Sequence, residues 1–389
     1  MRSLSLQLQS LFFKYNLRHQ LQTLTQAQLD TRDNFGTTSR PDHPSVPANP
    51  TFQNGVATKD LHIDPFSSLS VRIFLPETVK DTIFDSSVYG GYAPATGKRH
   101  RKLPIMLQFH GGGFVVGSND ASGNDVFCRR MAKLCDVIVV AVGYRLAPES
   151  QYPAAFEDGM AVVSWLAKQA NLAAVGRRRK GNGGSGNEGI VDRFGSSMVE
   201  PWLAAHGEYS RCVLLGVSCG ANIADYVARK AVEAGSLLDP LKVVAQILMY
   251  PFFIGSVPTK SEIKLANSYF YDKATCMIAW KLFLPREEFN LDHPAGNPLF
   301  PWRGPPIKTM PPTLTIVAEH DWMRDRGIAY SEELRKANVD APLLEYKNAV
   351  HEFATLDGLL QTPQALACAD DITIWVKKYL SLRGGEFSY

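Results

Sequence analysis

The sequence lacks the marks of several large classes of protein. Its 389 residues carry a net charge of only +3, a balance that favours neither nucleic acid nor an anionic membrane as a partner. No apolar run approaches the roughly 20 residues that a membrane-spanning helix needs. We therefore expect no stable membrane insertion. The six cysteines form no C-x-x-C pair and no zinc-ligand spacing, so we also expect no metal site.

What is present is an ordinary globular composition, with 45% hydrophobic and 20% charged residues. The length favours one large α/β domain with an attached cap over two independent domains. Several cysteines lie within predicted core elements, so we expect reduced, buried thiols and a cytoplasmic protein.

Short apolar runs alternate with helical patterns along most of the chain. We expect strands at 69–75, 103–109, 137–142, 213–215, 243–250, 311–318 and 342–346. Helices are expected at 124–134, 153–170, 273–284, 325–337, 363–380 and directly after Gly220. This alternation predicts a mostly parallel sheet that is covered by helices on both faces.

Residues 1–24 are rich in Leu and Phe and precede the first acidic residue, Asp30. In helical spacing they form two apolar stripes, which are Leu4, Leu8, Leu11, Phe12 and Tyr15, and Leu6, Phe13, Leu17 and Leu21. A helix with so much apolar surface should pack against something, and we predict a cap over a pocket. A cleaved mitochondrial transit peptide is the alternative, because the segment is basic and free of acids.

The remaining organisation follows from composition. Residues 31–58 are rich in Pro, Asn and Thr and indicate an extended connector, so we expect the cap helix and connector over 1–58 and the main α/β domain over 59–389. A Gly- and Arg-rich insertion at 176–189 and a basic run at 98–102 indicate surface loops. A nuclear signal is the alternative for either basic run.

The most informative stretch is Gly216-Val217-Ser218-Cys219-Gly220, between an apolar run and an amphipathic helix. A Ser on a sharp strand-to-helix turn is typical of a nucleophile elbow. The turn is crowded, and a side chain two residues before or after the Ser would collide with it. The helix that follows directs free N–H groups towards any anion that forms beside Ser218.

His110-Gly111-Gly112-Gly113-Phe114 follows the strand expected at 103–109. Consecutive glycines let the backbone approach a substrate closely and leave their N–H groups outside regular pairing. With the N–H of Cys219, the N–H groups of this loop are candidates for an oxyanion hole. We interpret His110 itself as a residue that fixes the loop.

A serine nucleophile needs a general base and an acid that orients it. His351 is the only histidine after the strand at 311–318 apart from His320 in the loop that directly follows it, and its place beyond the last strand makes it the candidate base. For the acid, the loop after that strand offers Glu319, Asp321 and Asp325. Their spacing alone does not decide among the three.

Taken together, these motifs resemble the hormone-sensitive-lipase group of α/β-hydrolases, the GDXG-type lipolytic enzymes, and most closely its plant carboxylesterase branch. The similarity covers residues 60–382 and includes Tyr144-Arg145-Leu146-Ala147-Pro148-Glu149, Asp321-Trp322-Met323-Arg324-Asp325 and His351-Glu352-Phe353. The resemblance implies a Ser218–Asp321–His351 catalytic triad and an oxyanion hole around Gly111, Gly112, Gly113 and Cys219. Val217, Trp322 and Glu352 depart from residues that are common in the family.

These observations lead us to expect a serine hydrolase that cleaves small to medium carboxylic esters through an acyl-enzyme, without metal or organic cofactor. The substrate pocket is expected in the cap region at 252–300, with Phe114, Tyr250, Phe252, Trp280 and Trp322 as candidate lining residues. The same plant branch includes gibberellin receptors, which lack the triad His, and relatives that perform non-hydrolytic cyclisation. A receptor or a cyclase or lyase is therefore the alternative function.

Overall fold

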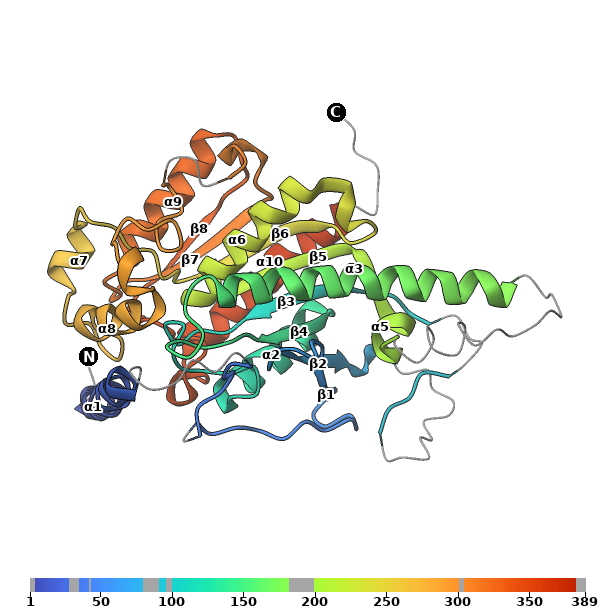
Figure 1. The fold of residues 1–389 in the computed structure, drawn as a ribbon, viewed down its shortest axis with the longest axis horizontal. Coiled ribbons are helices and arrows are strands. Elements are labelled where there is room, and N and C mark those ends of the chain that lie inside the picture. The colour runs from blue at the N-terminus through green and yellow to red at the C-terminus, as the bar shows by residue number, and fades with distance from the viewer. Residues whose placement is uncertain are drawn as a thin grey trace.

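The computed structural model describes residues 4–27, 35–41, 43–79, 91–95, 100–181, 199–300 and 304–382. In this part of the chain a central sheet runs in the order β1-β2-β4-β3-β5-β6-β7-β8 (Figure 1). Its strands are β1 (Val56–His62), β2 (Ser70–Pro76), β3 (Leu103–Phe109), β4 (Ile138–Gly143), β5 (Gly207–Val217), β6 (Val243–Met249), β7 (Thr313–Ala318) and β8 (Leu343–Tyr346). β2 is antiparallel to both neighbours and the other pairs are parallel, which confirms the predicted mostly parallel sheet.

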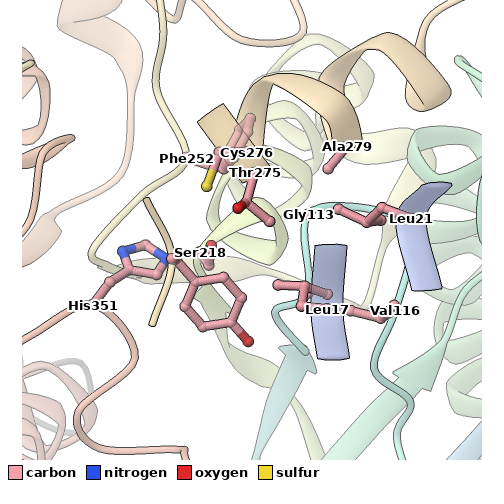
Figure 2. Close-up of a pocket in the computed structure, with 12 residues that line it drawn as sticks. Leu17, Leu21, Gly113, Val116, Ser218, Phe252, Thr275, Cys276, Ala279 and His351 are labelled. Carbon is pink, nitrogen blue, oxygen red and sulfur yellow. Dashed lines mark hydrogen bonds between the residues drawn. The ribbon is translucent and has the colours of Figure 1, made fainter. Parts of the chain in front are cut away.

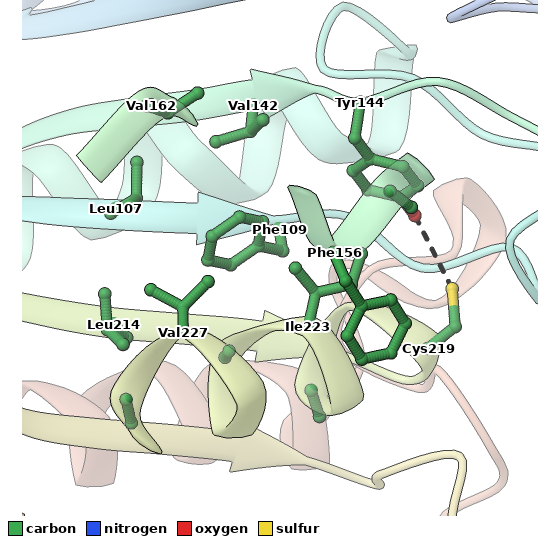
Figure 3. Close-up of a cluster of buried hydrophobic side chains, with 14 of the residues drawn as sticks. Leu107, Phe109, Val142, Tyr144, Phe156, Val162, Leu214, Cys219, Ile223 and Val227 are labelled. Atoms are coloured by element: carbon green, nitrogen blue, oxygen red, sulfur yellow. Dashed lines mark hydrogen bonds between the residues drawn. The ribbon is translucent and has the colours of Figure 1, made fainter. Parts of the chain in front are cut away.

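Helices cover both faces of this sheet (Figure 1). One face carries α3 (Ala154–Gly181), α6 (Cys219–Ala234) and α9 (Arg324–Lys336), and the other carries α2 (Ser122–Cys135) and α10 (Pro363–Leu382). Alternate residues of β3 point to opposite faces, so Leu107 and Phe109 pack towards α6 (Figure 3) while Met106 packs on the side of α2. The two-sided burial explains why the inner strands are apolar throughout.

Shorter elements complete the described chain. These are α5 (Pro201–His206), α7 (Lys260–Lys264), α8 (Lys273–Phe283) and 3₁₀ turns at Glu77–Val79, Gly235–Leu238, Arg286–Glu288, Ile307–Thr309 and Asp357–Leu359. Among the described residues, none of the helices combines the length and the apolar character needed to cross a bilayer.

Three sequence interpretations need correction. The connector expected over 31–58 ends earlier, because β1 begins at Val56 and the boundary at 58/59 falls inside this strand. The charged residues Lys59 and Asp60 interrupt the apolar pattern that predicts a strand. They are tolerated because β1 lies at the edge of the sheet and pairs only with β2. α3 continues to Gly181, so the start of the insertion expected at 176–189 is helical. The rest of that insertion lies outside the described residues. Residues 98 and 99 of the basic run at 98–102 also lie outside them.

The N-terminal helix α1 (Leu4–Ala27) packs against α8 as a cap. The Arg18 guanidinium lies 2.6 Å from the Asp272 carboxylate and the Lys14 ammonium lies 3.3 Å from it. Leu17 and Leu21, from the second stripe, are buried. The first stripe faces outwards, because Leu8, Leu11, Phe12 and Tyr15 are 59%, 64%, 70% and 70% exposed. Among the side chains that the structure describes, the second stripe therefore packs against the body of the protein and the first is mostly exposed.

Candidate active site

Ser218 lies at the turn between β5 and α6, at the carboxyl edge of the sheet. Its backbone has φ 53° and ψ −117°, a conformation that a residue with a side chain rarely adopts. A β-carbon built at Gly216 would lie 2.3 Å from the Gly220 carbonyl oxygen, and one at Gly220 would lie 2.3 Å from that of Phe109. These distances confirm that both glycines are required by crowding around the turn.

A continuous hydrogen-bonded relay leads away from this serine. The Ser218 hydroxyl lies 2.8 Å from Nε2 of His351, and Nδ1 of the same ring lies 2.7 Å from Oδ2 of Asp321. The three side chains follow β5, β8 and β7, whose parallel carboxyl ends meet at one edge. Each of the three residues is at most 2% exposed, so the relay is shielded from water.

The structure also separates the three acids that the sequence left open. Asp321 alone reaches His351, and its Oδ1 accepts a hydrogen bond of 2.9 Å from the Met323 N–H. Glu319 lies at the surface and accepts from the Asn348 N–H. Asp325 lies in the first turn of α9, as expected, and accepts from the Ser261 N–H. The geometry agrees with the acid that the resemblance implied.

The pKa of His351 reflects opposing influences. Burial lowers it, but the charge and hydrogen bond of Asp321, together with the charge of Glu352, raise the pKa above its ordinary value of 6.5. The rings of Tyr250 and Tyr271 also contact the imidazole, with centroids 5.2 Å and 5.3 Å away. This arrangement holds a basic imidazole against the Ser218 hydroxyl.

The glycine loop after β3 adopts a conformation that other residues would resist. Gly112 and Gly113 have φ values of 110° and 61°, and a β-carbon at Gly112 would lie 2.1 Å from the Val116 carbonyl oxygen. The Cys219 sulfur accepts a hydrogen bond of 3.1 Å from the Phe114 N–H. The residue after the nucleophile therefore fixes this loop through its side chain, a role that no motif in the sequence indicates.

His110 has the loop-fixing geometry that we expected. Its Nδ1 lies 2.8 Å from the Gly111 carbonyl oxygen, and its ring stacks on Tyr144 at 4.1 Å. Burial lowers the pKa of His110 to about 4, so the ring is neutral near pH 7. Because a carbonyl only accepts, Nδ1 carries the proton and Nε2 is an acceptor.

Glu352 is the most unusual residue of the site. It has φ 57° and is buried beside the loop, where a β-carbon on Gly111 would lie 2.1 Å from Oε1. Burial raises the pKa of its carboxyl, while the charge of His351 and hydrogen bonds from Tyr271 and the Gly112 N–H oppose that rise. The Gly112 N–H, one of the predicted oxyanion donors, therefore lies close to this carboxyl.

Two cavities meet at this point. The first, here called the crevice, has a volume of about 20 Å³ and is lined by Ser218, His351, Gly112, Gly113, Val116, Leu17, Leu21, Phe252, Tyr271, Thr275, Cys276 and Ala279 (Figure 2). The second, here called the polar chamber, has a volume of about 570 Å³ and lies between α1 and the glycine loop. Leu17, Gly112, Val116 and Tyr271 line both cavities, so the two are adjacent.

The predicted aromatic pocket was mostly wrong. Of the five candidates only Phe252 lines the crevice. Phe114 and Trp280 pack with Phe283 behind it, at centroid distances of 3.8 Å and 5.4 Å. Tyr250 and Trp322 are also fully buried. These large rings belong to the packed interior around the site and do not line either cavity.

Instead, the walls come from smaller residues that carried no recognisable motif. Thr275, Cys276 and Ala279 share one face of α8 and line the crevice opposite Leu17 and Leu21 (Figure 2). Among these five wall residues, only Leu17 and Leu21 were indicated by the sequence, through their apolar stripe on α1. The others become site residues through the packing of α8 against α1.

No group of three or more metal-ligating side chains occurs in the described part of the chain. All six cysteines are buried and free, as the sequence predicted.

Comparisons with known proteins agree with this geometry. Residues 106–355 match the family model described as an alpha/beta hydrolase fold. The chain is 60% identical to probable carboxylesterase 16 and 58% identical to probable carboxylesterase 11 of Arabidopsis thaliana, and both matches cover all of either chain.

The chain is also similar to proteins at lower sequence identity. The chain is 33% identical to the gibberellin receptor GID1C of Arabidopsis thaliana, over 80% of this chain and 78% of the receptor. Among solved structures, a thermostable esterase from Pseudomonas putida is similar with a TM-score of 0.62 at 22% identity, over 92% of this chain and 88% of that one. At that identity the likeness concerns the fold alone.

Proposed function

Because the chain belongs to the α/β-hydrolase fold family, we propose that it is a serine carboxylester hydrolase with Ser218 as nucleophile. The observation that carries the proposal is the relay of hydrogen bonds, 2.8 Å and 2.7 Å long, from Ser218 through His351 to Asp321. The two carboxylesterases with 58% and 60% identity over the whole chain support the same activity.

The geometry suits acyl transfer at each step. His351 accepts the proton of Ser218 through Nε2 as the hydroxyl oxygen attacks the ester carbonyl, and later returns it to the leaving alcohol. Asp321 accepts the Nδ1 hydrogen bond, which fixes the ring tautomer and stabilises the imidazolium. A water molecule activated by the same imidazole then hydrolyses the acyl-enzyme.

The negative charge of the tetrahedral intermediate requires nearby donors. We assign this role to the N–H groups of Gly112, Gly113 and Cys219, at the start of α6 and in the loop packed against it. The Gly112 N–H also lowers the pKa of the Glu352 carboxyl, so this donor lies close to that carboxyl. Gly111 lies further back, against Glu352, and we do not assign it a donor role.

The α1 cap belongs to the working enzyme in this proposal. Leu17 and Leu21 form one wall of the crevice, and its volume of about 20 Å³ is close to the space of one water molecule. A short acyl group therefore suits the site better than a long chain. We propose accordingly that α1 is retained rather than removed as a targeting segment.

The proposal can be tested with purified protein and 4-nitrophenyl acetate. We expect Ser218→Ala to reduce kcat/KM by about 10⁴-fold or more, because the substitution removes the hydroxyl that His351 activates. Ser256→Ala, at an exposed serine outside both cavities, is the matched control and should retain full activity. Equal rates for wild type and Ser218→Ala would contradict the proposal.

The receptor alternative has less support. The resemblance implies that gibberellin receptors lack the triad His, whereas His351 is present and hydrogen bonded to Ser218 here. The identity to such a receptor is 33%, against 60% to a probable carboxylesterase. Hormone binding without turnover of any ester would favour the receptor.

A further inference from the structure

The polar chamber differs in character from the crevice beside it. With about 570 Å³ it can hold a ligand of substantial size, whereas the crevice offers about 20 Å³. Because Gly112 and Tyr271 line both cavities, the chamber lies directly beside the place where an ester would react with Ser218. The two parts of such an ester would therefore meet different surroundings.

The chamber is lined partly by apolar side chains such as Phe12, Phe13 and Phe270, and polar side chains join them from opposite sides. Gln9, Asn16 and Gln20 come from α1, and Ser118, Asn124 and Asp357 from loops and α2 below it. The crevice, by contrast, is lined mainly by aliphatic and aromatic side chains such as Leu17, Leu21 and Phe252. A hydrophobic substituent suits the crevice, and a polar one suits the chamber.

Two side chains that line the chamber hold buried acceptors without a partner in the described part of the chain. His110 is neutral and its Nδ1 donates to the Gly111 carbonyl, which leaves Nε2 as an acceptor with no partner. Oε1 of Glu352 likewise has no partner. A buried acceptor without a donor is unfavourable, and a ligand that supplies donors removes that deficit.

These acceptors identify the chemistry of the ligand. Both need hydrogen-bond donors, and Glu352 as a carboxylate would repel a second anion. Hydroxyl groups are neutral donors and can also accept from the amide side chains of Gln9, Asn16 and Gln20 on α1. A polyhydroxylated group therefore satisfies these acceptors better than an apolar or acidic group.

We propose that the polar chamber binds the alcohol part of an ester that carries several free hydroxyl groups, while the crevice takes a short acyl group. Glu352 and His110 accept hydrogen bonds from those hydroxyls, and Glu352 determines the specificity. The inference rests on the proposed esterase function and specifies its substrate class.

The test compares two acetate esters with the same ring, inositol monoacetate and cyclohexyl acetate, which differ in the hydroxyl groups. We expect wild-type kcat/KM to favour the polyol ester by about tenfold or more, because a site built for hydroxyls discriminates against an analogue that lacks them. Glu352→Leu should abolish most of this preference, and Glu352→Gln, which keeps an acceptor oxygen, should lose less of it.

A matched pair on α1 tests the chamber without altering the residues around Ser218. Gln20 lines the chamber, whereas Gln22 lies on the same helix outside both cavities. Gln20→Leu should lower the preference for the polyol ester several-fold, and Gln22→Leu should leave it unchanged. If Glu352→Leu does not fold, as judged by circular dichroism, this pair carries the test.

Different failures lead to different conclusions. If 4-nitrophenyl acetate is hydrolysed through Ser218 but both cyclic acetates react equally well, the inference about the chamber is wrong and the esterase proposal stands. A preference for the methyl ester of a polyhydroxylated cyclohexanecarboxylic acid over inositol monoacetate would also overturn it, because the acyl part would then occupy the chamber. If no ester is hydrolysed, the proposed function fails and the inference fails with it.

Discussion

The floor and the wall of the active site are held in place by different means. The floor, formed by Ser218, His351 and Asp321, is attached to strand ends and joined by hydrogen bonds of 2.7–2.8 Å. The wall is α1, which depends on a few side chains such as Arg18, paired with Asp272 across 254 positions of sequence. Changes to the floor should therefore alter turnover, whereas changes to the wall should alter substrate binding.

The largest expected effect concerns the floor. Asp321→Asn keeps the size of the side chain but removes the charge that orients and stabilises the His351 imidazolium. We expect kcat to fall by about 10³–10⁴-fold, measured with 4-nitrophenyl acetate under saturating conditions.

Asp325→Asn is the control for this substitution. Asp325 lies four residues further along the chain and bonds the Ser261 N–H rather than His351. Its substitution should change kcat less than threefold, an expectation for a polar residue outside the relay. If Asp325→Asn proved as damaging as Asp321→Asn, the assignment of the acid would be wrong.

The floor was largely predictable from sequence because its determinants are local. Ser218 requires Gly216 and Gly220 on either side for steric reasons that hold in any such turn. Asp321 was the exception, since Glu319 and Asp325 have similar spacing and only the orientation of the loop distinguishes them. The resemblance, and not the spacing, selected it.

The wall was predictable only in part, since its contacts are long-range. The pattern of α1 gave two apolar stripes and did not say which faced inwards. Thr275, Cys276 and Ala279 line the crevice because of where α8 packs, which no local pattern encodes. Glu352, which lies beside His351 on the floor, was not predictable either, because its inward position depends on a backbone φ of 57°.

The second prediction compares the two stripes of α1. Leu21 is 1% exposed and Leu11 is 64% exposed. Leu21→Ala should weaken the docking of α1 by about 2–5 kcal/mol, the usual cost of truncating a buried leucine, and Leu11→Ala should have little effect. Hydrogen exchange of the α1 amides measures this directly, and equal protection in the two variants would mean that α1 does not dock through the second stripe.

A smaller effect is expected from the ion pair that holds the wall. Arg18 donates to Asp272 and Thr275 of the cap region, but Lys14 also contacts Asp272, so Arg18→Gln removes only part of the attachment. The pair is partly exposed, and we expect KM to rise roughly two- to fivefold with kcat little changed. His19→Gln, at the next position, should leave both constants unaltered, and a fall in kcat of Arg18→Gln would argue against the division between floor and wall.

The smallest effect is a shift in the pH profile, and it again separates floor from wall. His351 must be neutral to act as a base, and its pKa is raised above 6.5, so kcat/KM should fall as pH decreases through a midpoint above 6.5. Tyr250 and Tyr271, which also face the ring, stay neutral there because burial raises the pKa of both phenols well above the ordinary value. Glu352→Gln removes a negative charge that raises the His351 pKa, so the midpoint should move to lower pH. Arg18→Gln, in the wall, should leave the midpoint unchanged. An equal shift in both variants would show that the wall also changes the pKa of His351.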